Sequence, residues 1–364
     1  VENLPVGLQQ RVEIIRALIY DAKVLILDEP TAVLTPQETD ELLRNMKKLK
    51  AKGTSIVFIT HKLREVKEAA DKITIIRRGK VVGTASPSAS QEELASLMVG
   101  RPVSLDVEKT APKLGKVMLD VKNLNISDHT GRSLVKNVSF ELHTGEILAV
   151  AGVQGNGQTE LVEALTGLRI LDSGTVTLEK KPLHAGSPRE IAMAGVAHIP
   201  EDRNRDGMVK GMTIAENYIL NTYHLPQYSK NGLLNRKAIA AATEQAVKDF
   251  DVRTPSINTD IASLSGGNQQ KVVLAREMSR PHDVLLVAQP TRGVDVGSIE
   301  FIHDQIMKER DEQSTAVLLI STELDEVLAL ADRIAVMYRG EFIAIVPADT
   351  SREELGLLMA GVKR

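Results

Sequence analysis

A glycine-rich segment carries the clearest chemistry in the sequence. The largely apolar run Glu146–Ala151 is followed by Gly152, Gly155 and Gly157, and then by a helix-like stretch that begins near Thr159. Glycines at these positions let the backbone turn tightly, so that successive N–H groups and the helix N-terminus converge on an anion. A threonine hydroxyl at the start of such a helix is a ligand for Mg²⁺. The spacing therefore predicts a phosphate-binding loop.

The loop departs from the usual phosphate-binding pattern at Gln158, where that pattern has lysine. Glutamine donates hydrogen bonds but brings no positive charge to the β- and γ-phosphates, so weaker phosphate binding is expected. The alternative is a glycine-rich strand-to-helix turn that binds no ligand. The glycines alone do not decide between these two interpretations.

Two carboxylates stand at the end of another apolar run. Val24–Leu27 leads directly into Asp28 and Glu29, and His61 follows the next apolar run along the chain. Ligands bind at the carboxyl ends of strands in open α/β sheets, which is where these side chains would lie. A lone histidine there is more often a surface or helix-cap residue, but its spacing from the two acids favours a role in a site.

A segment with two adjacent glycines indicates which kind of protein combines these patterns. Leu264-Ser-Gly-Gly-Asn-Gln-Gln270 lies about one helix before the apolar run Val284–Val287, which leads into Pro290 and Thr291. This arrangement resembles the ATPase domains of ABC transporters, whose signature loop lies at a helix N-terminus. The resemblance implies that the Ser265 hydroxyl and the amides of Gly266 and Gly267 contact the γ-phosphate of ATP bound to the partner domain.

The resemblance also assigns roles to the residues described above. It implies that Asp28 holds Mg²⁺ through water, that Glu29 polarises the attacking water, and that His61 is the switch histidine at the γ-phosphate. ATP and Mg²⁺ are the implied cofactors. The expected ATP contacts are Gly152, Gln154, Gly155, Asn156, Gly157, Gln158, Thr159, Ser265, Gly266, Gly267, Gln269 and Asp295, and the expected metal ligands are Asp28 and Thr159.

The elements that must position these residues occur twice. Val24–Thr31 matches Val284–Thr291 at an offset of 260, and after one inserted residue Ile59–Leu63 matches Ile320–Leu324. In each copy a helical stretch separates two apolar runs and a third strand follows. The helical stretches are 37–52 and 298–312, the second apolar runs are 55–60 and 315–321, and the third strands are 72–77 and 333–338. This alternation predicts βαβ units around a parallel sheet that is covered on both faces.

The fold class implied by the resemblance is α/β, as P-loop NTPase domains of the ABC ATPase type with a parallel core sheet, an antiparallel β edge and a helical subdomain at about 202–262. The expected domains are 1–100, the C-terminal portion of a first ATPase domain, then the linker 101–116, then 117–364, a second and complete but degenerate domain. Residues 117–263 have no counterpart before the first copy, so we expect the front part of the first domain to be missing.

The two copies differ at the expected site residues. Ala288, Gln289 and Thr322 stand at the positions of Asp28, Glu29 and His61, and Pro5 and Val6 stand at those of Ser265 and Gly266. In ABC proteins each site combines the strand-end acids of one domain with the signature loop of the other. The intact parts therefore all fall in one predicted site, and the altered parts fall with Gln158 in the other.

The composition narrows the range of partners. With 45 Lys and Arg against 48 Asp and Glu, the net charge of −3 argues against an electrostatic footprint for nucleic acid. The chain has no Cys, which excludes disulfides, thiol nucleophiles and thiolate metal sites. No apolar run reaches the roughly 18 residues that a membrane span needs. We therefore expect no nucleic-acid partner and no membrane-spanning segment.

Two fused ATPase copies, with Pro200-Glu-Asp-Arg203 in the second, resemble the ATP-binding subunits of bacterial importers for nucleosides and simple sugars. Leu4–Glu13 and Gly155–Thr159 look more like the nucleoside branch, so the expected function is ATP hydrolysis that energises nucleoside import. The implied partners are two transmembrane permease subunits, docked through residues about 202–262, and indirectly an extracytoplasmic solute-binding protein. The chain would then lie peripherally at the cytoplasmic face of the cell membrane.

Two alternatives stay open at this point. One is an ATPase for the import of simple sugars, and the other is a nucleotide-binding pseudo-ATPase, because no loop of the chain carries the phosphate-binding lysine. For the same reason we expect little or no hydrolysis from the chain alone. A two-domain ABC protein of translation or DNA repair is disfavoured, since such proteins usually keep both sites and carry basic surfaces.

Overall fold

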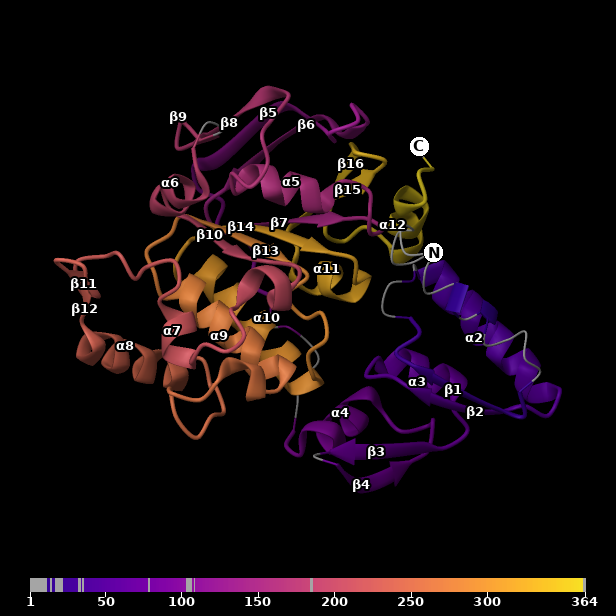
Figure 1. Cartoon of the computed structure of the whole chain (residues 1–364). Helices are drawn as coiled ribbons and strands as arrows, with labels where there is room; N and C mark the ends of the chain where they lie inside the picture. Colours follow the sequence, from indigo (N-terminus) through magenta and orange to yellow (C-terminus); the bar gives the residue numbers. More distant parts are fainter. Residues whose placement is uncertain are drawn as a thin grey trace.

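The computed structural model describes residues 12–13, 15–16, 22–31, 34, 36–77, 79–102, 107, 109–183 and 186–362 (Figure 1). The first-copy counterpart of the signature loop, with Pro5 and Val6, lies outside the described residues. No helix in the described part of the chain combines the length and the apolar character that crossing a membrane requires.

A six-stranded sheet forms the centre of the second copy, in the order β10-β13-β14-β7-β15-β16. Five of its strands are parallel, and β16 pairs antiparallel at one edge. The strands β7, β13 and β14 are buried along their whole length, because their apolar runs meet covering layers on both sides. The strands are β7 (Glu146–Ala151), β10 (Val196–Ile199), β13 (Val284–Ala288), β14 (Ala316–Ser321), β15 (Arg333–Tyr338) and β16 (Glu341–Pro347).

Each face of this sheet has its own cover (Figure 1). On one face α5 shares an apolar cluster with the core sheet and with an antiparallel sheet in the order β6-β5-β8-β9. On the other face α9, α10, α11 and α12 contribute to a second cluster with the core strands. These elements are β5 (Val117–Ser127), β6 (Ser133–His143), α5 (Gln158–Leu165), β8 (Ser173–Leu178), β9 (Lys181–Pro182), α9 (Gly266–Met278), α10 (Val296–Asp311), α11 (Leu324–Leu330) and α12 (Arg352–Met359).

A helical region lies between β10 and α9 in the chain and packs against α9. Its helices α7 (Ile214–Tyr218) and α8 (Arg236–Asp249) contact α9, and a short hairpin of β11 (Ser229–Lys230) and β12 (Leu233–Leu234) connects them. Thr213 caps the first helix with a capping box, which satisfies its leading N–H groups. The short helix α6 (Pro188–Met193) precedes β10. The parallel core sheet, the antiparallel β layer and the helical region together confirm the predicted fold class.

Residues 22–102 repeat the final part of the second copy element by element. The strands β1 (Val24–Asp28) and β2 (Ser55–Ile59) are parallel, and Val24 lies opposite Ser55 just as Val284 lies opposite Ala316. The helices α2 (Pro36–Ala51), α3 (Leu63–Ala69) and α4 (Gln91–Val99) correspond to α10, α11 and α12. The repeat seen in the sequence is therefore also present in the structure.

A β-hairpin repeats in the same detail. The strands β3 (Ile73–Arg77) and β4 (Lys80–Ala85) are antiparallel, with a register shift between Ile75 and Ile76. The hairpin of β15 and β16 shifts register between Val336 and Met337, which are the equivalent positions. The domain limits 1–100, 101–116 and 117–364 nevertheless stay predictions.

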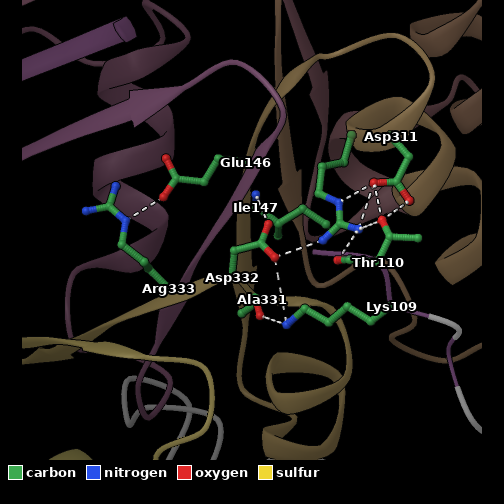
Figure 2. A network of polar contacts seen from close by, with 9 residues as sticks. Lys109, Thr110, Glu146, Ile147, Asp311, Ala331, Asp332 and Arg333 are labelled. Atoms are coloured by element: carbon green, nitrogen blue, oxygen red, sulfur yellow. Dashed lines mark hydrogen bonds and ion pairs between the residues drawn. The ribbon is translucent and has the colours of Figure 1, made fainter. Parts of the chain in front are cut away.

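The end of the predicted linker is attached to the second copy (Figure 2). Arg310 is fully buried and pairs with Asp332 at 2.8 Å, and its guanidinium also donates to the carbonyl and hydroxyl oxygens of Thr110 at 3.1 and 2.9 Å. Lys109 donates to the carbonyl of Ala331. A buried guanidinium needs such partners, because an unpaired buried charge is strongly destabilising. The end of the linker therefore forms part of the second copy's surface.

Candidate functional site

The glycine-rich loop joins β7 to α5, and two of its glycines have backbone conformations that other residues rarely adopt. Gly155 has a φ of 87° and Gly157 a φ of 108°. A Cβ atom at Gly157 would lie 2.7 Å from the carbonyl oxygen of Leu134, and one at Gly152 would lie 2.6 Å from that of Met337. The loop therefore needs glycine for its conformation and for its close approach to β6 and β15. The helix α5 begins directly after it, so the helix N-terminus faces the loop.

Gln158 does not point out of the loop. Its side chain is 5% exposed, and its amide donates to the carbonyl oxygen of Val153 at 3.2 Å. The amide therefore stabilises the loop itself in this conformation. Cations lie nearby on other elements: Arg132, Lys136 and Arg339 line a hollow of about 640 Å³ together with Gly155–Gly157.

Glu201 connects the glycine-rich loop to the segment that follows β13. Its carboxylate accepts hydrogen bonds from the Thr159 hydroxyl at 3.0 Å and from the Gln154 amide at 3.1 Å. Arg292 forms an ion pair with the same carboxylate at 2.7 Å. Two of the predicted ATP contacts, Gln154 and Thr159, thus share one carboxylate partner. The hydroxyl of Thr159 is a hard oxygen of the kind that Mg²⁺ prefers.

Arg203 is a residue that the sequence reasoning did not single out. It donates to the carbonyl oxygens of Arg292 and Gly293 at 2.7 and 3.0 Å. A Cβ atom at Gly266 would lie 2.6 Å from its guanidinium, so Arg203 also packs against the signature loop. Burial lowers the pKa of Arg203, and the nearby Asp202 opposes that effect. The run Pro200-Glu-Asp-Arg203 was noted for its resemblance, but only the contacts show that its arginine connects the segment after β13 with the predicted signature loop.

The signature loop begins α9. Ser265 is exposed and caps the helix, and its hydroxyl accepts from the Asn268 side chain at 2.9 Å. A Cβ atom at Gly267 would lie 2.6 Å from an Asp295 carboxylate oxygen, so the loop packs tightly on the start of α10. Asp295 caps that helix by accepting from the Ser298 amide at 3.1 Å.

Gln269 has a structural partner in this arrangement. Its side chain is 8% exposed, and its amide donates to the carbonyl oxygen of Ile261 at 3.2 Å. The predicted ATP contacts Ser265, Gly266 and Gly267 thus lie together at the helix start, whereas the Gln269 side chain points into the protein.

In the first copy, Glu29 and His61 lie side by side at the carboxyl ends of β1 and β2. The His61 Nδ1 atom is 3.0 Å from a Glu29 carboxylate oxygen, and the two side chains are 24% and 46% exposed. Glu29 has a φ of 44°, an uncommon value outside glycine that directs its side chain off the strand end. Asp28, the preceding residue, is exposed. A carboxylate held by an imidazole can orient a water molecule and accept its proton.

The second copy builds the same geometry from neutral groups. Gln289 has a φ of 47°, and its amide oxygen accepts from the Thr322 hydroxyl at 3.1 Å and from the Thr322 N–H at 3.2 Å. The amide N–H of Gln289 donates to Ile320 at 2.8 Å, just as that of Glu29 donates to Ile59 at 2.9 Å. The replacement therefore preserves the backbone and removes the group that could act as a base.

A cleft of about 1210 Å³ lies between the two copies, and we call it the inter-copy cleft. Glu29 and His61 line it from the first copy, and Gln154, Glu201 and Gln289 line it from the second. The cleft thus places the acid–histidine pair on the same cavity as Gln154, a predicted ATP contact, and Glu201. Ser265, Gly266 and Gly267 are not among its lining residues, so a joint site of Asp28, Glu29 and His61 with the signature loop stays a prediction.

Among the described residues, no cluster of three or more His, Asp or Glu side chains is arranged to hold a metal ion. The predicted metal ligands Asp28 and Thr159 lie at the end of β1 and the start of α5, on different copies. Mg²⁺ in nucleotide sites is commonly held by one or two protein oxygens together with phosphate oxygens. The Asp28 carboxylate at the end of β1 and the Thr159 hydroxyl at the start of α5 are each a protein oxygen of this kind, one in each copy.

Comparisons with known proteins agree on one group. Residues 135–292 match the ABC transporter family. The chain is 50% identical over 363 residues to the nucleoside import ATP-binding protein NupA of Lactococcus lactis subsp. cremoris, covering 99% of this chain and 72% of that protein. It is 47% identical to the guanosine import ATP-binding protein NupO of Bacillus subtilis, covering 99% and 71%.

A solved structure supports the fold. The ATP-binding cassette MJ0796, bound to ADP and phosphate, superposes with a TM-score of 0.56 and 20% sequence identity, covering 64% of this chain and 100% of that one. At this identity the likeness concerns the fold alone.

Proposed function

Because the chain belongs to the ABC transporter family of ATP-binding import proteins, we propose that it binds and hydrolyses ATP to energise the import of nucleosides. The similarity to a nucleoside importer and a guanosine importer supports the choice of solute. We also propose that the chain contains two fused ATPase domains, an interpretation that the matching registers of β1–β2 and β13–β14 support.

The observation that carries the proposal is the contrast between Glu29–His61 and Gln289–Thr322. The first pair can accept a proton from water, and the second pair has the same geometry without a base. A carboxylate at this place serves hydrolysis, whereas a site that only binds nucleotide has no need of one. We therefore place the chemistry at the first copy and nucleotide binding without hydrolysis at the second.

In the second copy, ATP that is bound without hydrolysis would lie with its phosphates at the glycine-rich loop, where Gly155 and Gly157 free the backbone N–H groups. Mg²⁺ would be held by the Thr159 hydroxyl at this loop and, in the separate site of the first copy, by the Asp28 carboxylate, and in each site it would supply charge stabilisation to the phosphates. In the site of the first copy, Glu29 would orient the attacking water and His61 would hold the Glu29 carboxylate in place. Ser265–Gly267 would complete the site of the first copy in a head-to-tail pairing.

The proposed partners are two transmembrane permease subunits and, indirectly, an extracytoplasmic solute-binding protein. The helical region at 202–262 is the proposed docking surface, since it projects from α9 and carries the exposed hairpin β11–β12 (Figure 1). This arrangement would hold the chain peripherally at the cytoplasmic face of the membrane.

Uptake by cells tests this proposal. Cells that express this chain with its cognate permease and binding protein should accumulate labelled nucleoside, and excess unlabelled nucleoside should compete while ribose should not. Competition by ribose alone would replace nucleosides with simple sugars, which is the alternative that the sequence leaves open. ATP binding to the purified chain without any turnover, in the presence and absence of the permease, would instead indicate a pseudo-ATPase.

A further inference from the structure

Two loops at equivalent positions of the two copies carry opposite charges. The loop after β2 ends at Lys62 and the first turn of α3 contains Arg64, whereas the loop after β14 ends at Glu323 and the first turn of α11 contains Asp325, each 261 positions further along the chain. The equivalence is fixed by the helices that follow, because α3 and α11 have the same length and begin one residue after Lys62 and Glu323. One backbone motif thus presents cations in the first copy and anions in the second.

These two loops meet at the inter-copy cleft. The Lys62 ammonium is 2.8 Å from a Glu323 carboxylate oxygen, and the two side chains are 22% and 39% exposed. Contact between equivalent positions is what two units related by a twofold axis produce at that axis. In two identical units the same contact would bring like charges together. Here the residue types differ between the copies, and the contact is attractive.

The neighbouring charges are paired within each copy. Arg64 pairs with Asp40 at 3.0 Å within the first copy, and Arg352 of α12 pairs with Asp325 within the second. Burial lowers the pKa of Arg352, the positive charge of Arg64 lowers it further, and Asp40 opposes both. Arg64 and Arg352 thus lie near each other across the boundary between the copies, and each is neutralised by a carboxylate of its own copy.

A second, apolar contact joins the copies beside these charges. Val296 at the start of α10 packs in one cluster with Leu94 and Ala95 of α4. A Cβ atom at Gly297 would lie 2.8 Å from a Val99 methyl group, so the glycine permits the helices to approach closely. The apolar contact supplies non-directional attraction, and the charges supply selectivity.

We propose that the charge-matched seam formed by Lys62, Arg64, Glu323, Asp325 and Arg352 specifies pairing of the first copy with the second. Pairing of two first copies would place Lys62 against Lys62, and pairing of two second copies would place Glu323 against Glu323. Both arrangements are repulsive, and such repulsion is how an interface excludes the wrong partner. The proposal rests on the two-copy part of the proposed function and is independent of ATP hydrolysis and of the solute.

A charge-reversal cycle on the full chain tests the seam. Because the chain contains no Cys, spin labels can be attached at Lys48→Cys in α2 and Glu244→Cys in α8, both exposed positions, without a background signal. Pulsed electron paramagnetic resonance then measures the distance between the copies. We expect Lys62→Glu and Glu323→Lys each to lower the ratio of closed to open molecules by about two- to fivefold. The double variant Lys62→Glu/Glu323→Lys should restore the original distances.

A matched control separates the seam from a general effect of charge. Lys47→Glu removes an ion pair with Glu68 that lies at 3.6 Å within the first copy, so it should leave the inter-copy distances unchanged. Circular dichroism verifies that every variant is folded. Single reversals that leave the distances unchanged, or a double variant that stays as open as the single variants, would overturn the proposal. Since nucleotide turnover is not the readout, failure here is distinguishable from failure of the proposed ATPase activity.

Discussion

The two copies use the same strands in the same register, yet β13 of the second copy is buried on both faces and β1 of the first copy is exposed on one face. In β1 the side chains of Val24 and Ile26 are 58% and 66% exposed, whereas their equivalents in β13, Val284 and Leu286, are both fully buried. In the second copy this face of the sheet is covered by α5 and by the antiparallel sheet. A strand's residue pattern therefore shows what the strand can bury, and the covering layer determines whether it does.

The copy with the more exposed strands carries the side chains that could act as acid and base. The well-covered second copy has the neutral pair Gln289–Thr322, and the less covered first copy has Glu29–His61. Burial stabilises a fold and does not require any particular group at a strand end. Buried strands and the proposed catalytic groups are thus distributed differently between the copies, and four experiments test this comparison.

The largest effect is expected at the acid. Glu29→Gln should lower ATP hydrolysis by the chain assembled with its permease by roughly 10²- to 10⁴-fold, because the general base is lost while its shape is kept. The matched variant Gln289→Ala should change the rate by less than about twofold, since glutamine cannot accept the proton. Steady-state phosphate release measures both. Equal losses in the two variants would contradict the assignment of the chemistry to the first copy.

Truncation of equivalent strand residues should lower the free energy of unfolding more in the second copy than in the first. Leu286→Ala removes a fully buried side chain and should lower the free energy of unfolding by about 2–5 kcal/mol. Ile26→Ala removes a side chain that is 66% exposed and should cost less than about 1 kcal/mol. Urea denaturation followed by circular dichroism gives both values. A cost at Ile26 that equals the cost at Leu286 would show that β1 is covered in solution.

The sequence predicted the elements of both copies closely. The second apolar runs expected at 55–60 and 315–321 are β2 and β14, shorter by one residue each, and the third strands expected at 72–77 and 333–338 are β3 and β15. Strand and helix periodicity are local properties, and the repeat let one copy support the interpretation of the other. The repeat also allowed the signature loop and the acids at the strand ends to be located along the sequence, because each motif has a counterpart at the same spacing in the other copy.

Other features could not be predicted because they depend on contacts between distant segments. The inward orientation of Gln158 depends on the carbonyl of Val153 within the folded loop. The role of Arg203 depends on carbonyls about 90 positions away, and the contact of Lys62 with Glu323 depends on how the copies pair. Arginine and lysine on loops are usually solvated, so their residue types give no signal of such contacts.

A buried histidine should make the second copy sensitive to acid. The Nε2 atom of His198 in β10 is buried without a hydrogen-bond partner, and burial lowers the pKa of His198 from 6.5 to about 4, although the carboxylate of Glu277 opposes this. Below pH 6.5 the unfolded chain binds a proton that the folded chain does not, so the free energy of unfolding falls as the pH falls toward 4. The loss should approach about 3 kcal/mol, since one pKa unit corresponds to about 1.4 kcal/mol.

Denaturation at a series of pH values between 7.5 and 4.5 checks this expectation. His198→Gln should flatten the pH dependence, because glutamine does not titrate. A pH dependence that survives in His198→Gln would assign the acid sensitivity to other groups.

The smallest effect is expected where the second copy has one residue more than the first. It lies in the turn between helix and strand, which has three residues after α2 and four after α10. Gly53 and Ser314 are equivalent turn residues with φ values of 99° and 55°. Only glycine adopts such values without strain, so Ser314→Gly should stabilise the protein by up to about 1 kcal/mol and Gly53→Ala should destabilise it by about 1 kcal/mol.

No atom lies within 4 Å of a Cβ at Gly53, so this effect isolates backbone strain from packing. Thermal unfolding of the two variants should therefore shift in opposite directions, and a shift in the same direction would mean that the two turns are not conformational equivalents.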